Sequence, residues 1–136
     1  MNTVRKKMSI GLVLGLFLAS CSDGEQTNLN GKWVAKWTTL PSSFEGVAEI
    51  TSFEMDGAFV FDGDSLTVVA YGYPGCVFGV DTIAHTQVWQ MANDSLHLIS
   101  EQNIRGISYR VKSVSDNQIE LQLMEDIFLS LNRDLR

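Results

Sequence analysis

The side chains that could bind a metal are few and scattered along the sequence. His85 and His97 are the only histidines, and no His-x-His, Glu-x-x-His or Cys-x-x-Cys spacing accompanies them. Zinc sites use such closely spaced ligands, so the sequence does not support one. The segment Asp62-Gly63-Asp64-Ser65 lacks the third spaced ligand and the distal glutamate of a twelve-residue calcium loop. A solvated turn explains this segment better, and we expect neither a metal nor a cofactor.

Nucleophilic and acid–base catalysis have no clear sequence pattern either. Serine, histidine and aspartate are present, but no Gly-x-Ser-x-Gly motif places a serine at a strand–helix turn. Cys76 has no base near it in the sequence, so nothing marks it as a nucleophile. The acidic pairs Glu54 and Asp56, and Glu125 and Asp126, fit turns at strand ends better than general acid–base chemistry. We therefore expect that the protein is not an enzyme.

The amino terminus has the pattern of a secretory signal. Arg5, Lys6 and Lys7 precede an uncharged apolar segment, residues 8–19. At about 12 residues this segment is shorter than the roughly 20 needed to cross a bilayer as a helix. The sequence Leu-Ala-Ser-Cys at residues 18–21 then resembles the lipobox of bacterial lipoproteins.

This resemblance implies cleavage before Cys21 and lipid on its sulfur. Two or three acyl chains, palmitate among the common ones, hold a protein to a membrane firmly, whereas one chain binds only marginally. The predicted organisation is a signal peptide at 1–20, a lipidated cysteine and flexible tether at 21–28, and one folded domain at 29–136. The alternative is a secreted protein in which Cys21 is free or forms a disulfide with Cys76 in an oxidising compartment.

The charge of the chain excludes some partners. The formal net charge is −6, and loss of Arg5, Lys6 and Lys7 with the signal peptide changes it to −9. Nucleic-acid binding needs clustered basic residues, so we expect no nucleic-acid partner. The same acidity argues against electrostatic adhesion to anionic lipid, and contact with the membrane is expected through the lipid on Cys21.

Residues 22–28 are small, polar and acidic, which is typical of a flexible tether. Asp23 and Glu25 resemble the acidic signal for surface export that follows the lipidated cysteine in Bacteroidetes lipoproteins, although a plain solvated linker explains them equally well. We expect a cell-envelope protein, anchored in the outer membrane and either periplasmic or surface-exposed.

From residue 29 onward the sequence predicts short β-strands. Apolar and polar residues alternate with period two, as in a half-buried strand, and turn residues separate the runs. The predicted turns are Asp56-Gly57, Gly63-Asp64, Asn93-Asp94 and Asp116-Asn117. A segment at 42–48 is predicted as a loop. The strands are expected near 32–39, 47–54, 57–62, 65–72, 76–82, 84–91, 95–101, 104–114, 118–124 and 126–132.

A meander of short antiparallel strands removes its exposed edges by closing into a barrel. We therefore predict an all-β fold, a small antiparallel up-and-down barrel of about 8–10 strands. The opening Asn30-Gly31-Lys32-Trp33 and the closing strand with Arg133 resemble the lipocalin-like domains of Bacteroidetes lipoproteins. That resemblance implies that Arg133 packs across Trp33 where the barrel closes, with Gly31 beginning the first strand.

The interior of the predicted barrel leaves two functions open. Lipocalins hold small apolar molecules, and the best candidates for a ligand rim are Tyr71, Tyr73 and Phe78, which flank the Pro74-Gly75 turn. A small barrel can also be filled by its own aromatic side chains. The first hypothesis is thus a membrane-anchored carrier of a small apolar ligand. The alternative is a non-enzymatic interaction module of the cell envelope with a self-filled barrel.

Three triplets resemble the O-glycosylation site of Bacteroidetes exported proteins, an aspartate followed by Ser or Thr and an apolar residue. They begin at Asp64, Asp81 and Asp94. A turn followed by a strand accounts for the same residues, and we favour that interpretation.

Overall fold

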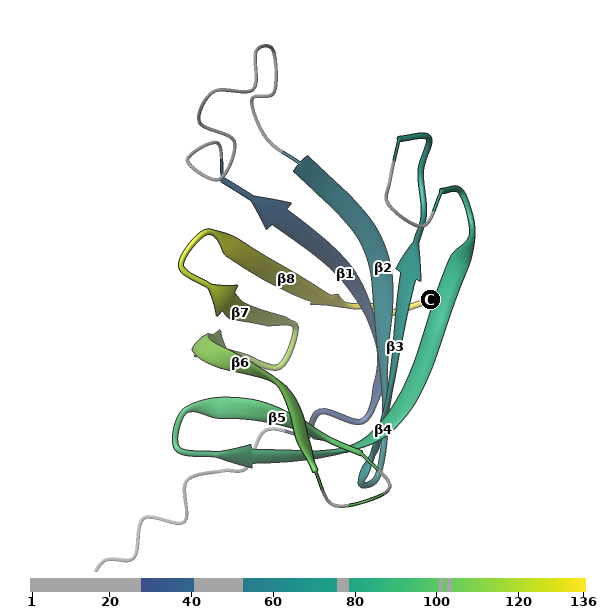
Figure 1. Ribbon diagram of the computed structural model, residues 1–136. Coiled ribbons are helices and arrows are strands. Elements are labelled where there is room, and N and C mark those ends of the chain that lie inside the picture. Colours follow the sequence, from purple (N-terminus) through teal and green to yellow (C-terminus); the bar gives the residue numbers. More distant parts are fainter. Residues whose placement is uncertain (1–27, 41–52, 76–78, 101, 103) are drawn as a thin grey trace, which may run out of the picture.

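The computed structural model describes residues 28–40, 53–75, 79–100, 102 and 104–136, and these form an antiparallel barrel. Each strand pairs with the next along the chain, and β1 pairs with β8 to close the ring (Figure 1). The strands are β1 (Gly31–Thr39), β2 (Phe53–Asp62), β3 (Ser65–Tyr71), β4 (Thr82–Ala92), β5 (Ser95–Ile99), β6 (Arg105–Val114), β7 (Gln118–Met124) and β8 (Ile127–Arg133). The predicted all-β, up-and-down barrel is confirmed.

Turn chemistry explains the tight connections. Gly63 lies between β2 and β3 with a φ of 60°. Asn93 and Asp94 both have positive φ, 51° and 56°, which suits the two-residue hairpin turn between β4 and β5. The turn between β6 and β7 contains Asp116 and Asn117, as predicted.

Two predictions about strands are wrong. The Asp56-Gly57 turn does not exist, because β2 runs unbroken through both residues. Glycine is needed there for packing: a Cβ on Gly57 would lie 2.6 Å from the Trp37 ring and closer still to the Val69 carbonyl oxygen. The strand at 76–82 is also absent from its described part, where Gly79 takes a φ of 65° in a turn and only Thr82 belongs to a strand. The loop predicted at 42–48 and most of the strand predicted at 47–54 lie outside the described residues.

The core occupies one end of the barrel, where the hairpins β2–β3, β4–β5 and β6–β7 turn. Period-two alternation sends one face of each strand inward, as it does for Trp33, Ala35 and Trp37 in β1. The largest side chains with less than 2% exposure are Trp33, Phe59, Phe61, Leu66, Leu96, Ile119, Leu121, Leu129 and Leu131. We call this the closed end of the barrel, and the opposite end, where β1 ends and β2 begins, the open end.

Candidate functional site

The closed end is fastened by a contact between the first and last strands. The Arg133 guanidinium carbon lies 4.3 Å from the Trp33 ring centroid. The same guanidinium donates hydrogen bonds to three backbone carbonyls, those of Asn28, Asn30 and Asp116. Trp33 Nε1 donates to the Leu29 carbonyl at 2.8 Å. This arrangement satisfies the buried indole and ties the segment before β1 to the end of β8.

Gly31 is the residue that lets the chain enter β1 beside this contact. Its φ is 118°, in the region that side chains rarely adopt, and a Cβ there would lie 3.5 Å from Arg133 Nη1. Gly31, Trp33 and Arg133 therefore come together at one point of the barrel, and their role is structural.

An aromatic layer separates the closed end from the open end. Trp37 packs on Phe59 with 5.8 Å between ring centroids, and Phe59 packs edge-on against Tyr109 at 6.1 Å. These three rings come from β1, β2 and β6 and extend across the interior. Burial raises the pKa of the Tyr109 phenol, and a hydrogen bond from Trp37 offsets part of that rise. We call these three residues the aromatic floor.

Beyond the aromatic floor the interior is open to solvent. Ile83 pairs with Ala70, on the inward face that Leu66 and Val68 define in β3, yet 45% of its surface is exposed. Met55, Val68, Leu123 and Ile127 are partly buried and pack against the core. An inward-facing isoleucine that still contacts water indicates that the chain does not fill this half of the barrel with the residues described.

The wall of the barrel also opens between β4 and β5. The β4–β5 ladder covers only Val88 to Ala92, so among the described residues Thr82 to Gln87 pair on one side alone, with β3. A cavity of about 390 Å³ lies at this gap. Its lining side chains are neutral and polar: His85, Thr86, Gln87, Ser100 and Gln102.

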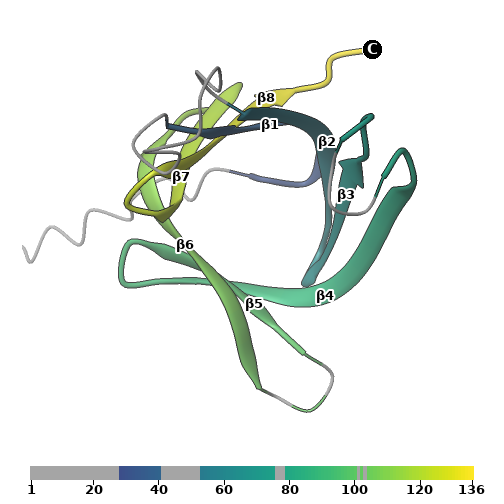
Figure 2. The same ribbon diagram turned by 45° about the horizontal axis from the view of Figure 1, so that its top comes forward.

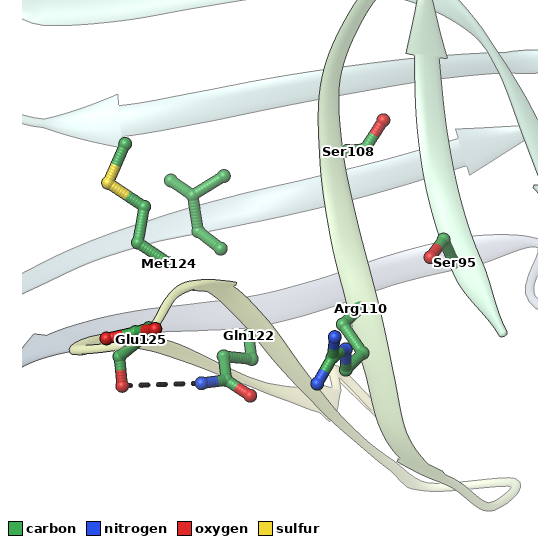
Figure 3. Close-up of a pocket in the computed structure, with 7 residues that line it drawn as sticks. Ser95, Ser108, Arg110, Gln122, Met124 and Glu125 are labelled. Carbon is green, nitrogen blue, oxygen red and sulfur yellow. Dashed lines mark hydrogen bonds between the residues drawn. The ribbon is translucent and has the colours of Figure 1, made fainter.

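A second opening lies on the other side of the β5–β6 hairpin. The β6–β7 ladder covers Arg110 to Val114, and residues 105–109 of β6 pair only with β5. A cleft of about 370 Å³ lies where this ladder ends (Figure 3). It is lined by Ser95, Ser108, Arg110, Gln122, Leu123, Met124 and Glu125. The hairpin between the two openings extends outward from the ring of strands (Figure 2).

The structure separates the residues proposed for a ligand rim. Tyr71 alternates with the inward-facing Ala70, so the register places it on the outer face of β3, where it is 42% exposed. Tyr73 packs on Phe53 at the open end, with 6.5 Å between ring centroids. Phe78 and Cys76 lie outside the described residues. Of the two rim candidates that the structure describes, Tyr71 ends β3 on the outer face and Tyr73 packs on Phe53.

Neither histidine belongs to a group of metal ligands among the residues that the structure describes. Within the described part of the chain, no three side chains among His, Cys, Asp and Glu come together as a metal site would require. His97 faces away from its neighbours Leu96 and Leu98, and it is only 7% exposed. Its Nδ1 lies 2.7 Å from the Ser108 hydroxyl oxygen, which supplies the partner that a buried imidazole needs.

The proposed signal peptide and Cys21 lie outside the described residues. No helix among the residues described is both long enough and apolar enough to cross a membrane.

Sequence reasoning missed two residues that the geometry brings forward. Ile83 fell between two predicted strands, although the alternation of β4 would have included it had the strand been extended by two residues. Arg110 drew no functional prediction, because nothing in the sequence shows that the strand ladder stops beside it. The first could have been found from periodicity, whereas the second depends on register and needed the structure.

Comparison with solved structures finds two proteins with a similar fold. A lipocalin-like protein from Bacteroides uniformis is similar in structure, with a TM-score of 0.53, 12% sequence identity, and coverage of 78% of this chain and 98% of that one. An uncharacterised protein from Bacteroides eggerthii gives a TM-score of 0.53 at 10% identity, covering 79% of this chain and all of that one. No family model matches the sequence, and no curated protein matches it significantly. At such low identity the likeness concerns the fold alone: the chain forms a closed, eight-stranded, lipocalin-like barrel.

Proposed function

We propose that this protein is a lipid-anchored protein of the bacterial cell envelope whose barrel binds a small apolar molecule at its open end. The observation that carries the ligand is Ile83, which faces inward but is 45% exposed. At the closed end, by contrast, nine large side chains have less than about 2% of their surface exposed. Water against inward-facing apolar surface is unfavourable, so an apolar molecule that displaces it gains free energy, about 25 cal/mol per Å² buried.

The residues that would contact such a ligand are apolar and come from different sides of the ring. Met55 and Val68 lie on β2 and β3, Ile83 on β4, and Leu123 and Ile127 on β7 and β8. The aromatic floor would form the bottom of the site, with Trp37 the ring nearest the opening. Apolar walls with a few polar groups are typical of small-molecule sites.

The membrane anchor rests on the sequence. The basic start, the short apolar segment and the Leu-Ala-Ser-Cys motif that ends at Cys21 support export and lipidation. The seven polar residues that follow would let the barrel stand away from the bilayer.

One measurement tests both parts of this proposal. The mature protein, extracted from its host membrane in mild detergent, is weighed by native and by denaturing mass spectrometry. Acyl chains on Cys21 remain in both spectra, whereas a carried ligand adds mass only in the native one. Absence of acyl mass at Cys21 would refute the anchor, and a native mass equal to the denatured mass would refute the carried ligand.

A matched pair of variants locates the ligand. Ile83→Gln places a polar side chain inside the open end and should remove the extra native mass. Val88→Gln makes a similar change on the outer face of the same strand, where Val88 is 43% exposed, and should keep it. Equal retention by both variants would place the ligand elsewhere.

A second function is favoured by the edge of β4. Thr82 to Gln87 carry no lysine or proline, the residues that commonly protect an exposed strand edge. Another protein could add a strand there through backbone hydrogen bonds. A photo-crosslinker at Ala84 that captures one defined envelope protein, and loses it when Thr86 is replaced by proline, would support this interaction role.

A further inference from the structure

The cleft between β6 and β7 has a more polar lining than the open end, with which it shares Leu123. It begins at the Arg110–Gln122 pair, the last one of the β6–β7 ladder toward the open end. The pairing of β7 with β8 shifts register between Gln122 and Met124, directly after this pair along β7. Its volume, about 370 Å³, lies within the range of small-molecule sites.

Arg110 brings a guanidinium to this cleft and forms none of the ion pairs found among the described residues. The ion pairs of the described residues join Lys32 and Arg136 to Asp134, and Lys36 to Glu54. Arg110 takes part in none of them, although the chain carries 16 acidic residues. An exposed arginine that forms no ion pair among the described residues is available to bind an anion, and its planar donors match a carboxylate.

The neighbours of Arg110 offer further hydrogen-bonding groups in fixed positions. Figure 3 shows Arg110 extending from β6 toward Gln122 on β7, with Ser95 on the opposite side. Gln122 Nε2 donates to the Glu125 carbonyl at 3.3 Å, so its side-chain oxygen is left to accept a hydrogen bond. The Ser108 hydroxyl is held by His97 at 2.7 Å.

Glu125 limits the charge of any anion in the cleft. Its carboxylate belongs to the same lining as Arg110, so the two formal charges cancel. A dianion such as phosphate would meet both an attractive and a repulsive group. A single carboxylate near Arg110 avoids that conflict, and hydroxyl groups on the same molecule could donate to the Glu125 carboxylate and the Gln122 oxygen.

We propose that this cleft binds a hydroxyl-bearing monocarboxylate of monosaccharide size, such as a uronic acid. Arg110 binds the carboxylate, Ser95 adds a hydroxyl donor, and Gln122 with Glu125 accepts hydrogen bonds from the sugar hydroxyls. Leu123 and Met124 provide apolar surface against which a sugar ring can pack.

Isothermal titration calorimetry tests this site. The full-length protein is titrated separately with glucuronate, glucose and inorganic phosphate. Glucuronate should bind. Glucose lacks the carboxylate and phosphate lacks the sugar hydroxyls, so each should bind at least about tenfold more weakly. Arg110→Gln should weaken glucuronate binding about tenfold or more. Lys112→Gln removes the same charge from the same strand outside the cleft and should leave the affinity unchanged.

Glu125→Gln separates this proposal from simple attraction of anions. The variant should bind phosphate more tightly than the unmodified protein does, because the repulsive carboxylate is gone. Three results would overturn the proposal: no binding of glucuronate, equal losses in Arg110→Gln and Lys112→Gln, or phosphate binding as tight as glucuronate binding in the unmodified protein. None of them bears on the apolar ligand, which the Ile83 variant tests separately.

Discussion

The two ends of the barrel differ in how completely the inward-facing side chains are buried and the strands are paired. At the closed end nine large side chains are almost fully buried, and Arg133 joins the first strand to the last. At the open end inward-facing Ile83 contacts solvent, and the strand ladders beside β5 and β6 are incomplete within the described residues. We therefore expect stability to be concentrated at the closed end, and the proposed ligand site lies at the other.

Replacement of Trp33 by alanine should give the largest loss of stability. The ring is fully buried, is stacked under Arg133 and donates to the Leu29 carbonyl. Truncation of a buried tryptophan costs about 3–5 kcal/mol. Ile83→Ala at the open end should cost less than about 1 kcal/mol, because much of that side chain is already exposed. Denaturant unfolding of both variants measures the difference in the free energy of unfolding. Similar losses would mean that the two ends contribute equally to stability.

Gly57→Ala should give the next largest effect. The added methyl group would overlap the Trp37 ring and the Val69 carbonyl, and overpacking of this kind costs about 1–3 kcal/mol. Gly106→Ala is the control, since its Cβ would lie 3.4 Å from the nearest atom, the Leu98 carbonyl oxygen. If the Gly57 variant were as stable as the Gly106 variant, Trp37 in the aromatic floor would be able to shift at little cost in free energy.

Arg133→Gln should cost about 1–2 kcal/mol, because a shorter side chain cannot reach three carbonyls and cover Trp33 together. Arg110→Gln removes the same charge from the cleft and should change the free energy of unfolding by less than about 0.5 kcal/mol. If both variants lost the same stability, Arg110 would be a structural residue and the contrast between the two ends would weaken.

The sequence predicted the closed end better than the open end, for a physical reason. Burial imposes period-two alternation, so Trp33, Leu121 and their neighbours follow a pattern that a reader can see. The Gly31-x-Trp33 start and Arg133 also carried a recognisable resemblance. Turns were correctly predicted at Gly63 and Asn93, where φ is positive. The Asp-Gly pair at Gly57 also suggested a turn, but this glycine lies within β2 and makes room for Trp37.

The open end depends on where ladders stop, which no short pattern specifies. Arg110 and Gln122 are far apart in sequence, and their cleft exists because the β6–β7 pairing ends beside them. Tyr71 was predicted at the rim from its place near a turn, yet one step of alternation puts it on the outer face. Register, more than residue type, decides which side chains form a site here.

The smallest predicted effect concerns the aromatic floor at high pH. Burial raises the pKa of Tyr109 above its ordinary value of 10.0, so the folded protein keeps this proton at a pH where the unfolded chain has lost it. Stability from this group is complete below pH 10 and is lost as the pH rises through the folded-state pKa. Tyr109→Phe should therefore flatten the decline in melting temperature above pH 10, and Tyr71→Phe, which removes an exposed phenol, is the control. An unchanged decline in the Tyr109 variant would mean that this ring is hydrated, and that the floor does not separate the two ends.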